Sequence, residues 1–275
     1  MACRLYARSF YRCAGTVNRT SSRLWIGLNI EEQTVIAFVQ ETLSFDTWQP
    51  DAINHFNRRL EESSAEEILG WAIDQFGEGF SIGSAFGASG MALIDIALRI
   101  NPDVDIFYID TDYFFPETLA LIERAQRHYN RPFRRVTSEM SVAEQERTHG
   151  PDLYRSNPDK CCNIRKVAPM GKALLGSTAW VSALRRDQSP TRAGTPVLRW
   201  NDKYGVVKVS PLVKWTEADV WAYIHTHDVP YNELHEQNYP SIGCWPCTQA
   251  VQPGGDLRAG RWVGLSKLEC GLHLT

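Results

Sequence analysis

The chain has 275 residues and a net charge of −3, with 43% hydrophobic and 22% charged residues. This composition excludes a disordered or fibrous chain, and the length is that of one large domain or two small ones. Residues 1–30 hold five arginines and no carboxylate, so the remainder is acidic, which argues against general nucleic-acid binding. Residues 79–94 are uncharged but rich in glycine and serine and short for a bilayer span, so no membrane partner is expected.

The composition predicts three parts along the chain. Residues 1–45 form an N-terminal extension, disordered or targeting, because residues 1–30 have the arginine-rich, acid-poor composition of an organellar transit peptide. We prefer the interpretation that this extension has no targeting role and that the protein is cytoplasmic. Residues 46–238 form an α/β domain. Residues 239–275, rich in glycine, proline, cysteine and tryptophan, form an irregular tail.

Predicted helices and strands alternate after a loop over residues 44–50. Ser64 opens a helix with a capping-box pattern, and Ser89 and Thr216 are expected to cap two later helices. The predicted strands cover residues 80–86, 104–110, 133–137, 180–184 and 206–209, and the helices between them include residues 89–99 and 116–129. This alternation predicts βαβ units and a mainly parallel sheet in an α/β fold.

Two predicted strands end in residues that suit a ligand. Ser84–Gly90 is a turn of small residues that enters a helix, where backbone N–H groups can approach an anion. Asp110 ends the next strand. Ligands of open α/β sheets bind beyond the carboxyl ends of the strands. Either turn alone is more often only a tight connection, and no P-loop or dinucleotide motif is present.

A third strand end carries a cluster of arginines. Arg185, Arg186 and Arg192 follow the predicted strand 180–184 within eight residues. Guanidinium groups bind phosphate or sulfate through paired donors. A solvated basic turn is the equally weighted alternative.

The cysteines are clustered and predict a metal centre. Cys161 and Cys162 are adjacent, and Cys244 and Cys247 form a CxxC motif. No secretory signal is visible, so a disulfide framework is not expected. Four thiolates suit zinc or a [4Fe–4S] cluster, and adjacent cysteines are easier to place on a cubane than on one tetrahedral ion. Two buried thiols plus a redox dithiol is the alternative.

One further cysteine lies near the chain end. Cys270 follows Glu269 and precedes a glycine, five residues before the last residue. A thiol on a terminal segment can move to reach a site, and its thiolate is the reactive form. An unremarkable terminal cysteine is the alternative that an isolated example would favour.

Together these motifs resemble the assimilatory adenylyl-sulfate reductases, which form one family with the phosphoadenylyl-sulfate reductases. The motifs are Cys161-Cys162, Arg185–Ser189, Cys244–Cys247 and Glu269–His273, in that order. The resemblance covers residues 64–273. It implies a doubly wound, mainly parallel sheet of the adenine-nucleotide α-hydrolase type, with an irregular C-terminal cluster-binding and catalytic tail. It also implies the reduction of adenosine 5′-phosphosulfate to sulfite and AMP, with thioredoxin or glutaredoxin as electron donor.

The resemblance implies a role for each motif. Cys270 would be the catalytic nucleophile and would form an S-sulfocysteine, and the four other cysteines would hold a [4Fe–4S] cluster. The substrate-binding residues expected from the strand ends and from the resemblance are Ser84, Gly87, Asp110, Lys166, Arg185, Arg186, Arg192, Arg258, Arg261 and His273. Self-association into a homo-oligomer is left open.

Two departures from the family pattern keep alternatives open. A glycine is usual in the family where Asp112 stands, and Phe86-Gly87 and Asp110–Tyr113 partly resemble the branch that uses the 3′-phosphorylated substrate. A 3′-phosphoadenylyl-sulfate reductase is therefore one alternative. A non-catalytic nucleotide-binding module stabilised by zinc or a cluster is another.

Overall fold

A computed structural model describes residues 48, 50–265 and 267–272. The chain divides into two units, Met1–Leu43 and Ser44–Thr275, and every described residue belongs to the second. The extension predicted over residues 1–45 therefore lies outside the described residues, as do His273 and most of the loop predicted over residues 44–50.

A six-stranded sheet with the order β3-β2-β1-β4-β6-β5 forms the centre of this unit. The strands are β1 (Phe80–Gly83), β2 (Asp105–Asp110), β3 (Arg134–Thr137), β4 (Ala179–Val181), β5 (Leu198–Asn201) and β6 (Val206–Val209). Only the β5–β6 pair is antiparallel among these strands, so the predicted mainly parallel sheet is confirmed. The strand order reverses between β1 and β4, and a crevice at such a reversal is where ligands of this architecture bind.

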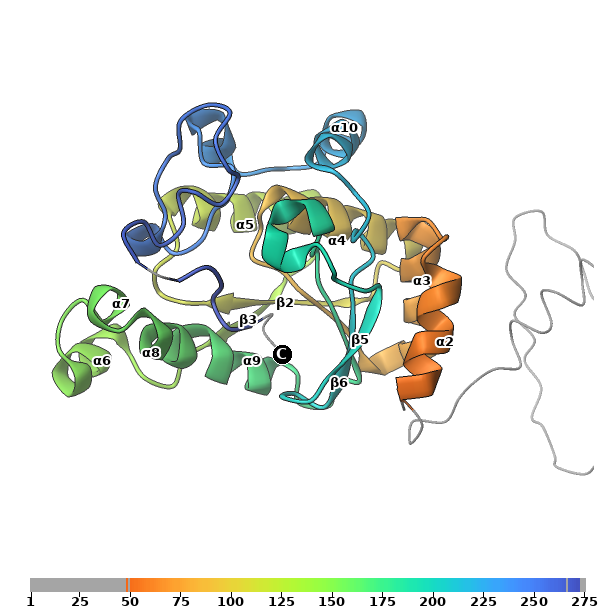
Figure 1. The fold of residues 1–275 in the computed structure, drawn as a ribbon, viewed down its shortest axis with the longest axis horizontal. Helices are drawn as coiled ribbons and strands as arrows, with labels where there is room; N and C mark the ends of the chain where they lie inside the picture. Colours follow the sequence, from red (N-terminus) through yellow and green to blue (C-terminus); the bar gives the residue numbers. More distant parts are fainter. Residues whose placement is uncertain (1–47, 49, 266, 273–275) are drawn as a thin grey trace, which may run out of the picture. The chain divides into compact units, whose positions relative to one another are not determined.

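Helices cover both faces of the sheet (Figure 1). Helices α4 (Ala88–Ile100) and α5 (Pro116–His128) connect β1 to β2 and β2 to β3, while α9 (Ala168–Ala173) contacts β2 and β3. The remaining helices are α2 (Pro50–Leu60), α3 (Ala65–Phe76), α6 (Val142–His149), α7 (Leu153–Ser156), α8 (Pro158–Cys162) and α10 (Glu217–His227).

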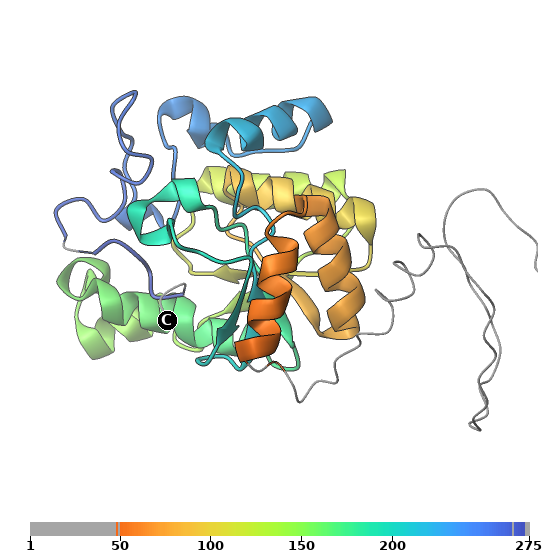
Figure 2. The ribbon, with the colours of Figure 1, turned by 45° about the vertical axis from the view of Figure 1, so that its right-hand side comes forward.

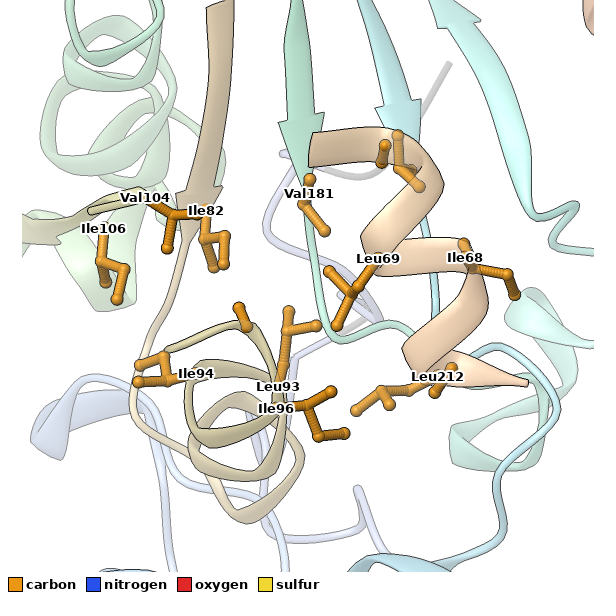
Figure 3. Packing of buried hydrophobic residues seen from close by; sticks show 14 of the residues in the cluster. Ile68, Leu69, Ile82, Leu93, Ile94, Ile96, Val104, Ile106, Val181 and Leu212 are labelled. Carbon is orange, nitrogen blue, oxygen red and sulfur yellow. The ribbon is translucent and has the colours of Figure 1, made fainter. Parts of the chain in front are cut away.

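Side-chain alternation along β2 divides the core between the two faces. Ile106 and Tyr108 belong to a large cluster with α3, α4 and α10. Phe107 belongs to a second cluster with Met170 of α9 and Trp180 of β4. Figure 3 shows the first cluster, in which leucine and isoleucine side chains of α3 and α4 meet those of the sheet. Successive side chains of a strand point to opposite faces of the sheet. Both sets are buried here, as expected for a doubly wound sheet with helices on both faces.

The predicted elements are largely confirmed, with differences at their ends. Ser64 caps α3 through a reciprocal capping box with Glu67. Helix α4 has Gly87 as its N-cap, so the prediction that Ser89 caps it is wrong. Ser89 is the second residue of the helix, and its hydroxyl accepts a hydrogen bond from Arg185.

Residues 239–265 and 267–272 form a mostly irregular segment, which we call the tail. Its ordered features are a short 3₁₀ turn at Trp245–Cys247 and a bridge between Thr248 and Arg261. Both views place the end of the tail beside α8 and α9 (Figures 1 and 2). Leu272 packs against the second core cluster there. Among the described residues, no helix has the length and apolar character needed to cross a bilayer.

Candidate active site

A cavity of about 270 Å³, which we call the strand-end cavity, lies at the carboxyl ends of β1, β2 and β4. Its wall combines residues of the turn after β1, side chains of β2 such as Phe107, residues of the loop after β4 such as Arg185, and residues of the tail such as Arg258 and Cys270. The strand order reverses between β1 and β4, and the cavity lies at the ends of both strands. It therefore occupies the position where ligands of this architecture bind.

The turn after β1 presents a helix start to this cavity. The Ser84 hydroxyl accepts a hydrogen bond from the N–H of Phe86 at 3.0 Å. Phe86 has a φ of +56°, and its buried ring packs edge-on against Tyr108. A Cβ at Gly90, in the first turn of α4, would lie 2.8 Å from the Ser84 hydroxyl and would have to displace it. The first N–H groups of α4, beginning at Gly87, are thus available to an anion.

The structure brings most of the predicted binding residues to the strand-end cavity. Those that line it are Ser84, Gly87, Lys166, Arg185, Arg192, Arg258, Arg261 and the predicted nucleophile Cys270. Asp110 and Arg186 do not line it. The Asp110 carboxylate accepts hydrogen bonds from Arg135, and the Arg186 guanidinium binds both carboxylate oxygens of Glu61 at 2.5 and 3.0 Å.

Arg185 lines the cavity, but its donors are already engaged. The side chain is 1% exposed and pairs with Asp187 at 2.9 Å and with Glu217 at 2.5 Å. It also donates to Ser89 of α4. A guanidinium group with these partners holds the loop after β4 against α4 and α10. Its role here is to fix the cavity wall.

Arg261 has a buried donor without a protein partner. Its Nη1 donates to Ser241 at 3.2 Å, and its guanidinium lies 4.6 Å from the centre of the Trp262 ring. Its Nε has no hydrogen-bond partner among the described residues. An unsatisfied buried donor costs about 1–3 kcal/mol, and an anionic ligand in the cavity would supply the missing acceptor.

The four predicted metal ligands line a second, smaller cavity, which we call the cysteine cavity. Cys161 and Cys162 lie at the end of α8, and Cys244 and Cys247 flank the short turn of the tail. Burial raises the pKa of Cys161 to about 12 and that of Cys247 to about 11, and neighbouring cysteines add to both shifts. Within the described residues, no three His, Cys, Asp or Glu side chains converge as ligands of one metal ion.

Arg165 provides a test of whether a sulfur-rich cluster fits the cysteine cavity. Its side chain is 1% exposed, its Nη1 pairs with Asp112 at 2.8 Å, and its Nε donates to Gln145 at 2.9 Å. Its buried Nη2 has no partner among the described residues, and Arg165 lines the cysteine cavity. Four thiols and an unpaired cationic donor around one cavity fit a group rich in anionic sulfur, such as [4Fe–4S].

The two cavities share a wall. Lys166, Cys244 and Trp262 line both of them. Burial opposes the charge on Lys166, but the pKa of its ammonium group is raised by Cys244, Cys270 and Cys162. One cationic side chain therefore faces the cysteines on one side and the strand-end cavity on the other.

Glu269 is a functional candidate that the sequence did not single out. It lines the strand-end cavity and binds Arg192 and Arg258. Burial opposes its ionisation, but the hydrogen bonds and charge of Arg192 lower its pKa below the ordinary carboxyl value. The signal was present in the sequence, since Glu269 directly precedes Cys270 in the E-C-G-L-H motif.

Comparison with known proteins identifies the family. The model of the phosphoadenosine phosphosulfate reductase domain matches residues 80–250. The chain belongs to the phosphoadenosine phosphosulfate reductase family. Its relatives include the adenosine 5′-phosphosulfate reductases of Staphylococcus epidermidis, 45% identical over 86% of this chain and 98% of the relative, and of Halalkalibacterium halodurans, 43% identical over 80% and 96%.

Solved structures place this reductase-family chain in the same fold. The phosphoadenylyl-sulfate reductase of Candida auris, solved as a phosphate complex, is 32% identical and matches with a TM-score of 0.66 over 74% of this chain and 98% of that one. An FMN adenylyltransferase of Candida glabrata, solved with FMN and an ATP analogue, matches at 0.51 with 13% identity over 78% and 69%. The second likeness concerns the fold alone, and the predicted adenine-nucleotide type of fold is confirmed.

Proposed function

We propose that the protein is an assimilatory adenylyl-sulfate reductase, which converts adenosine 5′-phosphosulfate to sulfite and AMP. The observation that carries this proposal is the place of Cys270. Its thiol lines the same cavity as the start of α4 and the basic side chains of Lys166, Arg258 and Arg261. Relatives with this name cover most of the chain at 41–45% identity, which supports the choice of substrate.

The cavity suits a nucleotide that carries two linked anionic groups. Its apolar part includes Phe107, Ile109 and Leu272, which suit a base and ribose. Its basic part lies beside Cys270. A thiolate and a phosphosulfate repel each other, so cationic side chains at their meeting point are required for reaction. Lys166 and Arg261 supply such charge in the proposed site.

In the first proposed step the Cys270 thiolate attacks the sulfur atom of the phosphosulfate. A bond forms between Sγ of Cys270 and that sulfur, and the bond from sulfur to the phosphate oxygen breaks. AMP leaves with the electron pair of the broken bond. The product on the protein is an S-sulfocysteine, and the donors around the cavity stabilise the charge on the leaving phosphate.

In the second proposed step a dithiol protein such as thioredoxin or glutaredoxin restores Cys270. Its thiolate attacks Sγ of Cys270, and sulfite leaves with the electron pair of the S–S bond. Its second thiol then displaces the Cys270 thiolate from the mixed disulfide. Sulfur is reduced from S(VI) to S(IV), and the dithiol is oxidised to a disulfide. The identity of this donor, any homo-oligomer and a cytoplasmic location stay predictions.

The proposal includes a [4Fe–4S] cluster held by Cys161, Cys162, Cys244 and Cys247. These thiols line one cavity together with the unpaired Nη2 of Arg165. When bound, such a cluster would join α8 to the tail and place its charge beside Lys166. The chemical steps above are assigned to side chains of the chain alone.

The direct test replaces the nucleophile. In Cys270→Ser, sulfite release from adenosine 5′-phosphosulfate is expected to fall to background, because serine is scarcely ionised near neutral pH. AMP binding and iron content are the controls and should be unchanged. Without a reductant, the wild-type protein should carry a sulfonate adduct on the Cys270 peptide, detected by mass spectrometry. Normal turnover by the serine variant, or an adduct elsewhere, would contradict the proposal.

A 3′-phosphoadenylyl-sulfate reductase is the second candidate. The 32% identity to the Candida auris enzyme and the residues Phe86-Gly87 and Asp112-Tyr113 favour it. Sulfite release measured in parallel with the two nucleotides separates the candidates. A higher kcat/KM for the substrate without a 3′-phosphate is expected, and the opposite preference would replace the first proposal by the second.

A further inference from the structure

The carboxylate of Glu269 is held by two arginines of the strand-end cavity. Its Oε1 accepts a hydrogen bond from Nε of Arg192 at 2.9 Å, and its Oε2 accepts from Nη2 of Arg192 at 2.8 Å. Oε2 also accepts from Nη2 of Arg258 at 3.2 Å. The Glu269 side chain is only 6% exposed. Paired charges this buried are weakly screened by salt and solvent.

Arg192 has little left to offer a ligand. Besides Glu269, its Nη1 donates to the side-chain oxygen of Gln188 at 2.5 Å. All three guanidinium nitrogens therefore have protein acceptors. The contrast with Arg261, whose Nε has no partner among the described residues, divides the arginines into two kinds. Arg261 lines the cavity and makes no ion pair with Glu269, whereas all the donors of Arg192 are engaged by the protein.

Leu272 attaches the tail beyond Cys270 by packing against the second core cluster, and the other polar attachments of this part of the tail are more exposed. Leu268 is 69% exposed, and its carbonyl accepts a hydrogen bond from Arg258. Lys267, whose side chain is 9% exposed, pairs with Asp159, whose side chain is 84% exposed, so solvent screens the carboxylate of this pair. Among the described residues 267–272, Glu269 makes the ionic attachment in which both partners are largely buried, directly beside Cys270.

We propose that Glu269 is the positioning residue that seats Cys270 in the strand-end cavity, with Arg192 and Arg258 as its anchors. This inference rests on the proposed function, in which Cys270 is the nucleophile. Holding a nucleophile at its place of attack raises its effective concentration. Arg192 then acts on the reaction through Glu269, while Arg261 and Lys166 remain for the substrate anion.

Glu269→Gln tests whether Glu269 positions Cys270, because the substitution keeps the shape of the side chain and removes its charge. A charge-assisted hydrogen bond is worth about 1.5–3 kcal/mol, which corresponds to a factor of ten or more in an equilibrium. Formation of the Cys270 adduct in a single turnover with adenosine 5′-phosphosulfate and no reductant should slow about tenfold or more. Alkylation of Cys270 by iodoacetamide should accelerate, and AMP affinity should stay within about twofold.

The alkylation rate of each variant is divided by its rate in urea, which removes the effect that the neighbouring charge has on the thiol in the unfolded chain. Glu269→Asp, which keeps the charge on a shorter side chain, should recover part of the adduct rate. Glu139→Gln is the matched control, because Glu139 is an exposed glutamate paired with a lysine and should give wild-type values. Arg192→Gln combined with Glu269→Gln should be no slower than the worse single variant.

The outcomes separate this inference from the proposed function. If the wild-type protein forms no adduct, the proposed function fails. If it does, unchanged adduct formation and alkylation in Glu269→Gln overturn the positioning role. A loss of AMP affinity without faster alkylation would also overturn it, because Glu269 would then only order the binding arginines. Slower adduct formation with faster alkylation of Cys270 supports the positioning role of Glu269.

Discussion

Gly243 leaves no space for a side chain against the guanidinium group of Arg261. A Cβ built at Gly243 collides with Nη2 and lies 2.6 Å from Cζ of that arginine. Both residues line the strand-end cavity. The direction of the Arg261 donors therefore depends on the absence of one methyl group in the tail.

Gly243→Ala should weaken binding of the substrate. The new methyl group displaces the Arg261 guanidinium, and a lost charge-assisted hydrogen bond costs about 1.5–3 kcal/mol, or about tenfold or more in affinity. Calorimetric titration of Cys270→Ser protein with adenosine 5′-phosphosulfate measures this without turnover. Gly194→Ala is the control, because nothing lies within 4 Å of its Cβ position. Equal affinities of the two variants would contradict the assignment.

Cys161→Ser should lose the cluster. Serine is a poor ligand for iron, and a cluster that joins two chain segments contributes to folding. We expect iron and acid-labile sulfide to fall well below the wild-type content and the brown colour to bleach. Cys270→Ser should retain both, since Cys270 does not line the cysteine cavity. Stoichiometric zinc without iron in anaerobically prepared wild-type protein would refute the cluster.

Asp112→Asn should destabilise the fold by about 1–3 kcal/mol, the cost of leaving a buried charged donor poorly paired. Asp112 has a φ of +59° and binds Arg165 at 2.8 Å. Asparagine tolerates the left-handed conformation, so the variant isolates the ion pair. Asp228→Asn is the control, because Asp228 is exposed and has a φ of +53°. Urea unfolding of both variants measures the difference, and equal midpoints would contradict the prediction.

Lys208→Met should remove a pH dependence of stability. Lys208 is 2% exposed in β6, and burial, aided by Arg199 and Arg192, lowers its pKa to about 7. The unfolded chain has the ordinary lysine pKa of about 10.4. Between these values the unfolded state binds a proton that the folded state lacks, so the free energy of unfolding rises with pH.

The measurement is urea unfolding of both proteins from pH 6 to pH 10. The difference in unfolding free energy, wild type minus Lys208→Met, should increase with pH above about 7 and be flat below it. Taking the difference cancels the titration of the cysteines, which is common to both proteins. Parallel curves over the whole range would show that Lys208 is charged in the folded state throughout.

The sequence predicted the elements whose signals are local. The capping box at Ser64 and the apolar run of β6 each specify their element through neighbouring residues alone. Helix α2 was missed, although its buried residues Ile53, Phe56 and Leu60 have the i, i+3, i+7 spacing of one helix face. The pairing of β5 antiparallel to β6 depends on contacts that no short pattern encodes.

The sequence predicted which residues line the strand-end cavity better than it predicted the hydrogen bonds that they make. The motifs indicated that arginines gather near Cys270, but not which of their donors are already taken. Arg186 turns to Glu61, 125 residues away, and Arg185 turns to Glu217, 32 residues away. Such partners are set by the packing of α2 and α10 against the loop after β4. Local sequence therefore cannot distinguish an arginine that binds ligand from one that fixes a wall.

The seat of Cys270 within a cavity of about 270 Å³ has a kinetic consequence. That space accommodates a small molecule, and a protein thiol donor is far too large to enter it. Under the proposed function, the thiol cannot meet both reactants in one arrangement of the tail, so the tail must leave its seat before the donor reacts. Release of AMP before the donor binds would then give the parallel steady-state lines of a ping-pong mechanism at several donor concentrations. The rate at which the tail leaves its seat sets an upper limit on turnover that no increase in substrate can exceed.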